Sequence, residues 1–166
     1  MNPRYEGMRL YGKTMVGVVL LAVFAAGDAA AQADKTPAAS PNPEEVVNRY
    51  LEALKAGNFA AAYDQISKEM AQNKDRDAWA KEQQWTMQMS DAKIFDFHVY
   101  PGKIEGDRAH VPNLLSSQDK FLNQLGVQEH ELYTLIREDG QWKIDQQQLL
   151  EKSEQRKWFP SQTQEP

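Results

Sequence analysis

Three tyrosines are the residues whose type and position come nearest to acid–base chemistry. Tyr50, Tyr63 and Tyr133 lie among apolar residues at helical or strand spacing, so their phenol groups are expected to point into the domain. A buried phenol takes part in proton transfer when a tuned acid or base stands beside it. Asp96 and His98 alternate with apolar residues and are expected to face away from the interior. Because no inward acid with a neighbouring histidine is apparent, we assign no catalytic residue and favour a non-enzyme, with catalysis left open.

The histidines are the candidates for a metal site, because the chain has no cysteine. His98, His110 and His130 each lie on an expected strand, and Asp96 could add a carboxylate oxygen. No two of the histidines are two or four residues apart, so surface histidines are the favoured interpretation. The sequence also has no glycine-rich phosphate loop, serine nucleophile elbow or metalloprotease motif. We therefore expect no metal and no cofactor.

Two amphipathic helices are expected to position the first two tyrosines. Asn42 can cap the first helix, Pro43 suits its first position, and an apolar stripe follows at helical spacing. That stripe consists of Val46, Val47, Tyr50, Leu51 and Leu54. Gly57 ends this helix and Asn58 caps the next. The buried face of the second helix is expected to comprise Phe59, Tyr63, Ile66 and Met70.

A third helix and then a set of strands follow. The helix is expected from Arg76 to about Trp85, with Trp79 and Trp85 as its main apolar residues. Residues 94–100 then alternate, which predicts a strand with one apolar face formed by Phe95, Phe97 and Val99. In the strand expected over residues 108–115, Pro112 has no amide donor and therefore predicts an edge position or a bulge.

The segment from Ser116 to Gln128 has the least regular pattern, and it suggests a loop that carries a helical turn. It contains Phe121, Leu122 and Leu125. A long loop with apolar residues can be a lid over a site. The alternative is that these residues plug one end of the core, and we favour it because exposed apolar side chains would be a liability.

The final hairpin has the clearest signal, because Asp139-Gly140 joins two β-rich runs. A two-residue turn pairs Arg137 with Trp142 and places Tyr133, Leu135, Trp142 and Ile144 on one face. A three-residue loop would instead put Ile136 beside Trp142, and we favour the first register. That register leaves Leu132 and Ile136 on the opposite face. Either a second subunit or the C-terminal tail, with Leu149, Leu150, Trp158 and Phe159, is expected to cover them.

The N-terminal 33 residues are typical of a secretory signal peptide. Basic residues precede an uncharged stretch over residues 14–27, and small residues follow. Cleavage is expected after Ala33, with the bond after Ala31 as second choice and an uncleaved membrane anchor as the alternative. A membrane-spanning helix needs roughly 20 apolar residues, which this stretch does not reach. We therefore expect a periplasmic or secreted protein with no stable membrane insertion after cleavage.

The rest of the chain is expected to form one domain. Residues 34–41 read as a disordered spacer, 42–150 as the domain and 151–166 as a tail. The formal net charge is -5, which argues against a nucleic-acid partner because phosphate binding needs a basic surface.

Two stretches resemble the nuclear transport factor 2-like superfamily. They are P-E-E-V-V-N-R-Y-L-E-A-L-K-A-G-N-F-A-A-A-Y at residues 43–63 and L-I-R-E-D-G-Q-W-K-I at residues 135–144. The chain is most similar to exported bacterial members of the lumazine-binding-like or unknown-function type. The resemblance implies an α+β fold, in which a curved antiparallel sheet packs on the N-terminal helices as a cone-shaped, cystatin-like roll. It implies no activity, since members include ketosteroid isomerase, scytalone dehydratase and polyketide cyclases as well as ligand-binding and accessory domains.

A pocket in the cone is the site that this fold implies. Its expected lining is Tyr50, Leu54, Tyr63, Phe95, Phe97, Tyr133, Leu135 and Trp142. We expect a binding or accessory protein that takes a small apolar ligand in the cone or a partner protein on the sheet, and homodimerisation through the sheet is plausible. The alternatives are a lyase or isomerase of the dehydratase or ketosteroid isomerase type, and a structural adaptor in an envelope assembly.

Overall fold

The computed structural model describes residues 41–159, so the expected signal peptide, nearly all of the expected spacer and residues 160–166 lie outside it. The elements in chain order are α1 (Pro43–Lys55), α2 (Phe59–Tyr63), α3 (Arg76–Ser90), β1 (Lys93–Val99), β2 (Lys103–Glu105), β3 (Arg108–Gln118), β4 (Gln128–Glu138), β5 (Gln141–Leu149) and α4 (Lys152–Trp158). No helix within the described residues is long and apolar enough to cross a membrane.

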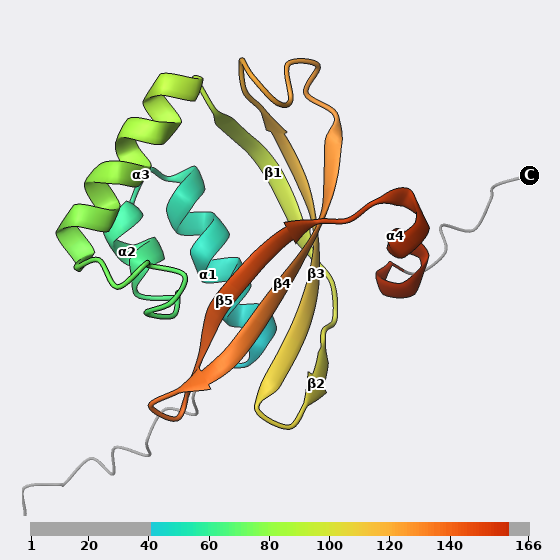
Figure 1. Ribbon diagram of the computed structural model, residues 1–166. Coiled ribbons are helices and arrows are strands. Elements are labelled where there is room, and N and C mark those ends of the chain that lie inside the picture. Colours follow the sequence, from blue (N-terminus) through green and yellow to red (C-terminus); the bar gives the residue numbers. More distant parts are fainter. Residues whose placement is uncertain (1–40, 160–166) are drawn as a thin grey trace, which may run out of the picture. The chain divides into compact units, whose positions relative to one another are not determined.

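A curved antiparallel sheet separates two helical layers (Figure 1). Its strand order is β1-β3-β4-β5, and β2 also pairs with β3. Helices α1 to α3 lie on one side, and α4 lies on the other. The α1 stripe packs on the inner face of the sheet, where the fully buried residues include Val111, Tyr133, Leu135 and Ile144. The predicted packing of the early helices on later strands is therefore confirmed, and the fold is α+β.

The caps form as predicted, but the second helix is shorter than expected. The side chain of Asn42 accepts from the amide of Glu45 at 2.8 Å. Helix α2 ends at Tyr63, so the expectation that Ile66 lies on its buried face is wrong. Ile66 forms a parallel bridge to Ile144 instead, because the adjacent backbone pairs with β5 through a hydrogen bond from the amide of Ser67 to the carbonyl of Ile144 at 2.8 Å.

Two expected strand features need correction. Phe95 is 50% exposed, because the register of β1 against β3 shifts between Ile94 and Asp96 and turns that side chain out of the inner face. Pro112 lies in an interior strand and not at an edge or bulge. Its carbonyl accepts from the amide of Tyr100 at 2.9 Å, and its nitrogen faces the same side, at the break between β1 and β2. No strand donor is therefore needed there.

The last hairpin has the predicted two-residue turn. Arg137 pairs with Trp142 and Leu135 pairs with Ile144. Asp139 and Gly140 both have positive φ, 50° and 78°, as a two-residue hairpin turn with matching twist requires. The predicted inner face of Tyr133, Leu135, Trp142 and Ile144 is confirmed, since all four residues are buried in the core.

The loop over residues 119–127 does not plug the core. Phe121, Leu122 and Leu125 are 61%, 92% and 90% exposed. The favoured interpretation of these three residues is therefore wrong. The reason is that β3 runs to Gln118 and β4 starts at Gln128, so the strands carry the loop beyond the end of the core.

Helix α4 covers part of the outer face of the sheet, as the tail alternative predicted. The ring of Trp158 lies 5.5 Å from that of His110, and the ring of Phe159 lies 4.7 Å from that of His130. Leu132 on this face is buried. The C-terminal tail therefore supplies a cover for residues that the hairpin alone would expose.

Candidate functional site

A buried carboxyl group lies on the inner face of the sheet. Glu131 is 1% exposed, and its oxygens accept three hydrogen bonds from neutral side chains. The donors are the Asn113 amide at 2.8 Å, the Tyr133 hydroxyl at 3.0 Å and the Gln147 amide at 2.7 Å. No Lys or Arg within residues 41–159 forms an ion pair with Glu131. A buried carboxyl with only neutral partners is uncommon and costly, so it marks a candidate site.

The strand register assembles this cluster. Glu131 and Tyr133 are two residues apart on β4, so both point to the inner face. Asn113 on β3 pairs with Glu131, and Gln147 on β5 pairs with Tyr133. On the helix side, the ring of Tyr50 meets that of Tyr133 edge to face at 6.1 Å. Four elements therefore hold the site, and each contributes its side chain from a regular position.

Burial dominates the electrostatics of the cluster. It raises the pKa of the Glu131 carboxyl above its ordinary value of 4.5, although the hydrogen bonds from Asn113, Gln147 and Tyr133 oppose that shift. Burial and then the negative charge of Glu131 raise the pKa values of Tyr50 and Tyr133 well above that of a free phenol. Both phenols therefore stay protonated, and the carboxyl holds its proton to a higher pH than a surface glutamate.

Asn113 has one polar atom that lacks a partner. Its amide nitrogen donates to Glu131, but its carbonyl oxygen Oδ1 is buried and accepts no hydrogen bond from residues 41–159. A buried acceptor left without a donor costs about 1–3 kcal/mol. Such an atom needs a donor from outside the protein, either an ordered water or a hydroxyl or amine of a ligand.

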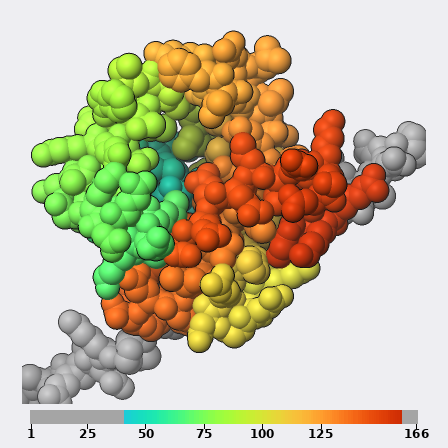
Figure 2. Space-filling view, viewed as in Figure 1, coloured from blue at the N-terminus to red at the C-terminus, as the bar shows by residue number. Residues whose placement is uncertain are grey.

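A hollow lies between α3 and the sheet. Figure 2 shows it bordered by α3 and by the end of β5, with α1 at its floor. Some inward residues of the domain are incompletely covered. Leu54 and Phe97 are partly buried, and Leu149, which pairs with Glu131, is 61% exposed. Apolar walls with a few convergent polar groups are typical of a small-molecule site.

Seven of the eight residues expected to line the pocket belong to the hydrophobic core or pack against it. They are Tyr50, Leu54, Tyr63, Phe97, Tyr133, Leu135 and Trp142. The Tyr63 hydroxyl donates to the carbonyl of Lys74 at 2.9 Å, and its ring lies 5.9 Å from that of Trp79. Phe95 is turned outward by the bulge.

The polar residues of the cluster were not predicted. No inward acid was identified from the sequence, but Glu131 is one, and it accepts a hydrogen bond from the Tyr133 hydroxyl. The signal was present: Glu131 alternates with Tyr133 and Leu135, and Asn113 alternates with Val111 and Ala109, so simple alternation places both inward. Gln147 could not be found in this way, because β5 changes register opposite Thr134 and Leu135.

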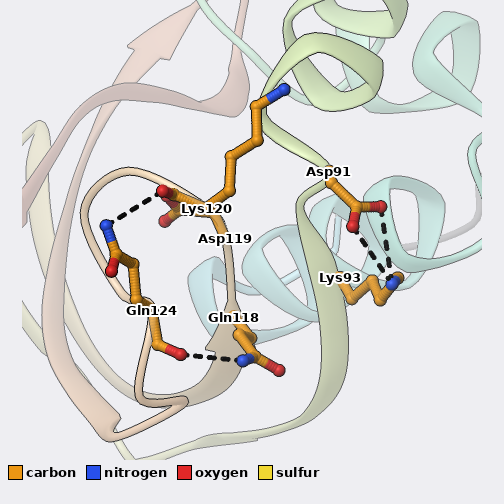
Figure 3. Close-up of a pocket in the computed structure, with 6 residues that line it drawn as sticks. All are labelled: Asp91, Lys93, Gln118, Asp119, Lys120 and Gln124. Carbon is orange, nitrogen blue, oxygen red and sulfur yellow. Dashed lines mark hydrogen bonds and ion pairs between the residues drawn. The ribbon is translucent and has the colours of Figure 1, made fainter.

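Two other polar regions do not form a comparable site. A cleft of about 370 Å³ near the end of α3 is lined by the six residues in Figure 3, which are largely bonded to one another or to the loop backbone. Lys93 pairs with Asp91, and the Gln118 amide donates to the carbonyl of Gln124. The three histidines lie on outward-facing positions of the sheet, and within residues 41–159 no group of three or more His, Asp or Glu could hold a metal.

Comparison with known proteins gives information on the fold alone. No protein-family model matches the chain, and no curated protein matches its sequence. A SEC-C motif containing protein from Rhodopseudomonas palustris is similar in structure, with a TM-score of 0.50 and 14% identity over 66% of this chain and 79% of that one. A cystatin-like domain of unknown function from Nostoc punctiforme has a TM-score of 0.49 and 12% identity over 68% and 78%.

Nuclear transport factor 2-like proteins are also among the similar structures. One of unknown function from Cytophaga hutchinsonii has a TM-score of 0.39 and 14% identity over 64% of this chain and 86% of that one. The description of that protein names the superfamily that the two sequence stretches resemble. At such low identities the likeness says nothing of the residues at a site.

Proposed function

We propose that this protein binds a small, mainly apolar molecule in the hollow of the cone, with a hydrogen-bond donor of that molecule directed at the Asn113–Glu131 pair. The observation that carries the proposal is the buried Oδ1 of Asn113, which accepts from no described residue. It stands beside a carboxyl that burial keeps protonated to a higher pH than usual. A hydroxyl, amine or amide on an otherwise apolar ligand would satisfy this acceptor.

Partly buried apolar residues support the size and polarity of the ligand. Leu54 and Phe97 are only partly buried and Leu149 is 61% exposed, so apolar surface is available to such a ligand. Gln147 is exposed and donates to Glu131 Oε1, so it lies between the carboxyl and solvent. Rotation of this one side chain would free a carboxyl oxygen for a ligand while the other two hydrogen bonds remain.

The test is native mass spectrometry of the protein purified from its own envelope fraction. We expect a mass excess of one small molecule, which organic extraction removes. Leu54→Trp, which adds a large ring at the hollow, should abolish the excess. Ile104→Trp is the matched control, because Ile104 is 59% exposed on β2, away from the hollow, and this variant should retain the ligand. A wild-type protein with no bound molecule in such a preparation would contradict the proposal.

Proton-transfer catalysis is the second candidate function, and one contact favours it. The Tyr133 hydroxyl donates to Glu131 Oε2 at 3.0 Å, so a carboxyl with a raised pKa and a phenol are joined in a hydrophobic setting. Such a pair suits the general acid–base step of a lyase or isomerase. The two functions differ in Glu131→Gln: a binding protein should still hold the extracted molecule, whereas an enzyme should lose its conversion of that molecule.

We further propose that the protein acts after export, in the periplasm or outside the cell. The support is the sequence of its first 33 residues, with a basic start, an apolar stretch and small residues before Ala33. N-terminal sequencing of the protein from the envelope should begin at Asp34. An intact Met1 in that fraction would favour the uncleaved anchor instead.

A further inference from the structure

The end of the domain formed by α3 and the loop over residues 119–127 exposes a group of large apolar side chains. We call this group the apolar tip. It consists of Trp85, Met89, Phe121, Leu122, Leu125 and Val127, each about half exposed or more. A concentration of this kind on one end of a domain marks an interaction surface, since scattered single apolar residues are the ordinary case.

The loop is built to hold these side chains outward. The carboxylate of Asp119 accepts from the amides of Phe121, Leu122 and Asn123 at 2.6, 2.7 and 3.1 Å. These bonds lower the pKa of Asp119, so its charge stays inside the loop. The buried side chain of Asn123 donates to the carbonyls of Ser117 and Val127 and accepts from the amide of Val127. The exposure of the apolar side chains therefore belongs to an ordered structure and not to a frayed loop.

The same hydrogen bonds pair most of the backbone amides of the loop within the protein. The amides of residues 119–123, 126 and 127 all donate within the protein, and that of Lys120 donates to the carbonyl of Ser90 in α3. The Gln124 side chain donates to the carbonyl of Lys120, and that of Gln118 to the carbonyl of Gln124. Unpaired backbone groups are costly in an apolar phase, so pairing these amides lowers the cost of placing the loop at its boundary with water.

Charge is nearly absent from the apolar tip, although the protein is acidic. The chain has 24 acidic and 19 basic residues, yet residues 83–90 contain none of either and residues 120–128 contain only Lys120. Figure 3 shows Lys120 extended away from the loop backbone, and Lys93 paired with Asp91 at the base. A lysine beside exposed aromatic and aliphatic residues is common at a lipid interface, where its amine stays among the head groups.

The size of the apolar tip indicates whether a small molecule or an extended apolar layer would cover it. An apolar groove of about 480 Å³ runs between Trp85 and Met89 on α3 and Phe121 and Leu122 on the loop. A small molecule in this groove would leave Leu125 uncovered, because that residue does not line it. Leu122 and Leu125, the most exposed residues of the tip, project from a single loop, which suits insertion into a deformable apolar layer.

We propose that the apolar tip docks this protein reversibly on the surface of a lipid bilayer. Phe121, Leu122 and Leu125 enter the boundary between head groups and acyl chains, and Trp85 lies at the head-group level. The two lysines near the tip, Lys93 and Lys120, are offset by Asp91 and Asp119, so a neutral bilayer suffices and anionic lipid adds little. This is surface docking and not membrane spanning, and it does not depend on the function proposed for the cone.

Vesicle flotation tests the proposal directly. The chain from Asp34 to Pro166 is suitable, because the hydrophobic core lies wholly within residues 46–144 and the apolar N-terminal stretch would itself bind lipid. Phosphatidylcholine vesicles are compared with vesicles that contain one quarter phosphatidylglycerol, each at low and high salt. We expect the protein to float with both, with less than twofold change on adding salt, since the contact is apolar.

Matched variants locate the contact. Leu122→Asp should lower vesicle binding about tenfold or more, because about 1.4 kcal/mol corresponds to a factor of ten and burial of a leucine contributes at least that much. Ile104→Asp makes the same kind of change at an exposed residue on β2 and should bind as wild type does. Urea unfolding must show that both variants are folded. If Leu122→Asp is not folded, Leu125→Asp takes its place.

Three results would overturn the proposal. The first is a wild-type chain that stays with the soluble fraction. The second is an Ile104→Asp variant that loses as much binding as Leu122→Asp. The third is a wild-type dimer in sedimentation that Leu122→Asp dissociates, without vesicle binding. That result would assign the apolar tip to a second copy of the chain.

Discussion

Asn113 and Glu131 face each other across the β3–β4 ladder, where the Asn113 amide donates to Glu131 Oε2 at 2.8 Å while its own Oδ1 accepts nothing from the described residues. A central position of the sheet thus carries a carboxyl and an amide where apolar residues would pack more favourably. Such a pair costs stability, and that cost is consistent with a role in binding or proton transfer.

Replacing Glu131 by Gln should change how stability depends on pH. Burial raises the pKa of Glu131 in the folded chain above the 4.5 of the unfolded chain. The folded state therefore binds more protons across that window, and the stability contributed by the neutral carboxyl is present below pH 4.5 and is lost as pH rises through the folded pKa. Because Gln does not titrate, the free energy of unfolding of Glu131→Gln relative to wild type should increase from pH 4 to pH 8, as measured by urea unfolding.

Glu105→Gln is the control for this measurement, since Glu105 is an exposed residue on β2. Its free energy of unfolding should follow that of wild type across the same pH range. A relative stability of Glu131→Gln that stayed flat or decreased with pH would show that the carboxyl is ionised in the folded protein throughout.

Replacing Asn113 by Ala should destabilise the domain by about 2–4 kcal/mol. The variant removes a donor from a buried carboxyl and leaves a small cavity in the sheet, and losses of this kind fall in that range. Asn48→Ala is the comparison, because Asn48 donates to the carbonyl of Glu44 from a partly buried position on α1 and should contribute less than about 1 kcal/mol. Urea midpoints at pH 7 give both values, and equal losses would argue against a special role for the Asn113–Glu131 pair.

Local chemistry explains which parts of the fold could be predicted from the sequence. Asn42, Asn58 and Asp139-Gly140 act within a few residues of themselves, so the caps and the hairpin register follow from the chain alone. At Ile66 tertiary pairing overrides the local helical pattern. This residue forms a bridge to Ile144 in β5 and does not continue the helix. The bulge that turns Phe95 outward likewise arises from the pairing of β1 with β3. The sequence of β1 alone therefore does not predict it.

The candidate site divides in the same way. Its apolar lining follows from periodicity, because apolar residues on an inner face are what a hydrophobic core requires. Its polar members violate that expectation, and they were not identified, although alternation places Glu131 and Asn113 inward. Functional positions are where sequence rules for a stable core are expected to fail.

Helix α4 should be a removable cover on the outer face of the sheet. None of its residues is buried, and its contacts come chiefly from the Trp158 ring on His110 and Lys103 and from Phe159, which adjoins its end. Replacing both aromatic residues by Ala should lower the free energy of unfolding by about 1–2 kcal/mol. Amide exchange over residues 152–158 should become fast while the sheet stays protected.

The exposed residue Arg156 on α4 supplies the control, and Arg156→Ala should leave both measurements near wild type. Sedimentation of the double variant adds a second readout. Leu132 is buried on the face that α4 covers, so loss of the cover should increase self-association. Unchanged exchange over residues 152–158 would mean that other contacts hold the helix.

Gly102 should tolerate no side chain, because it joins the start of α1 to the sheet. Its amide donates to Glu44 Oε1 at 2.8 Å, and a Cβ at this position would lie 2.8 Å from the carbonyl oxygen of His110 and 2.9 Å from Val111 Cγ2. A backbone carbonyl within β3 cannot move aside without breaking the ladder, so Gly102→Ala should cost about 1–3 kcal/mol. Gly106→Ala meets no atom within 4 Å but has a φ of +61°, so its cost is limited to strain of about 1 kcal/mol. If urea unfolding shows Gly102→Ala to be the milder of the two, the contact between α1 and the Gly102 turn is looser than these distances require.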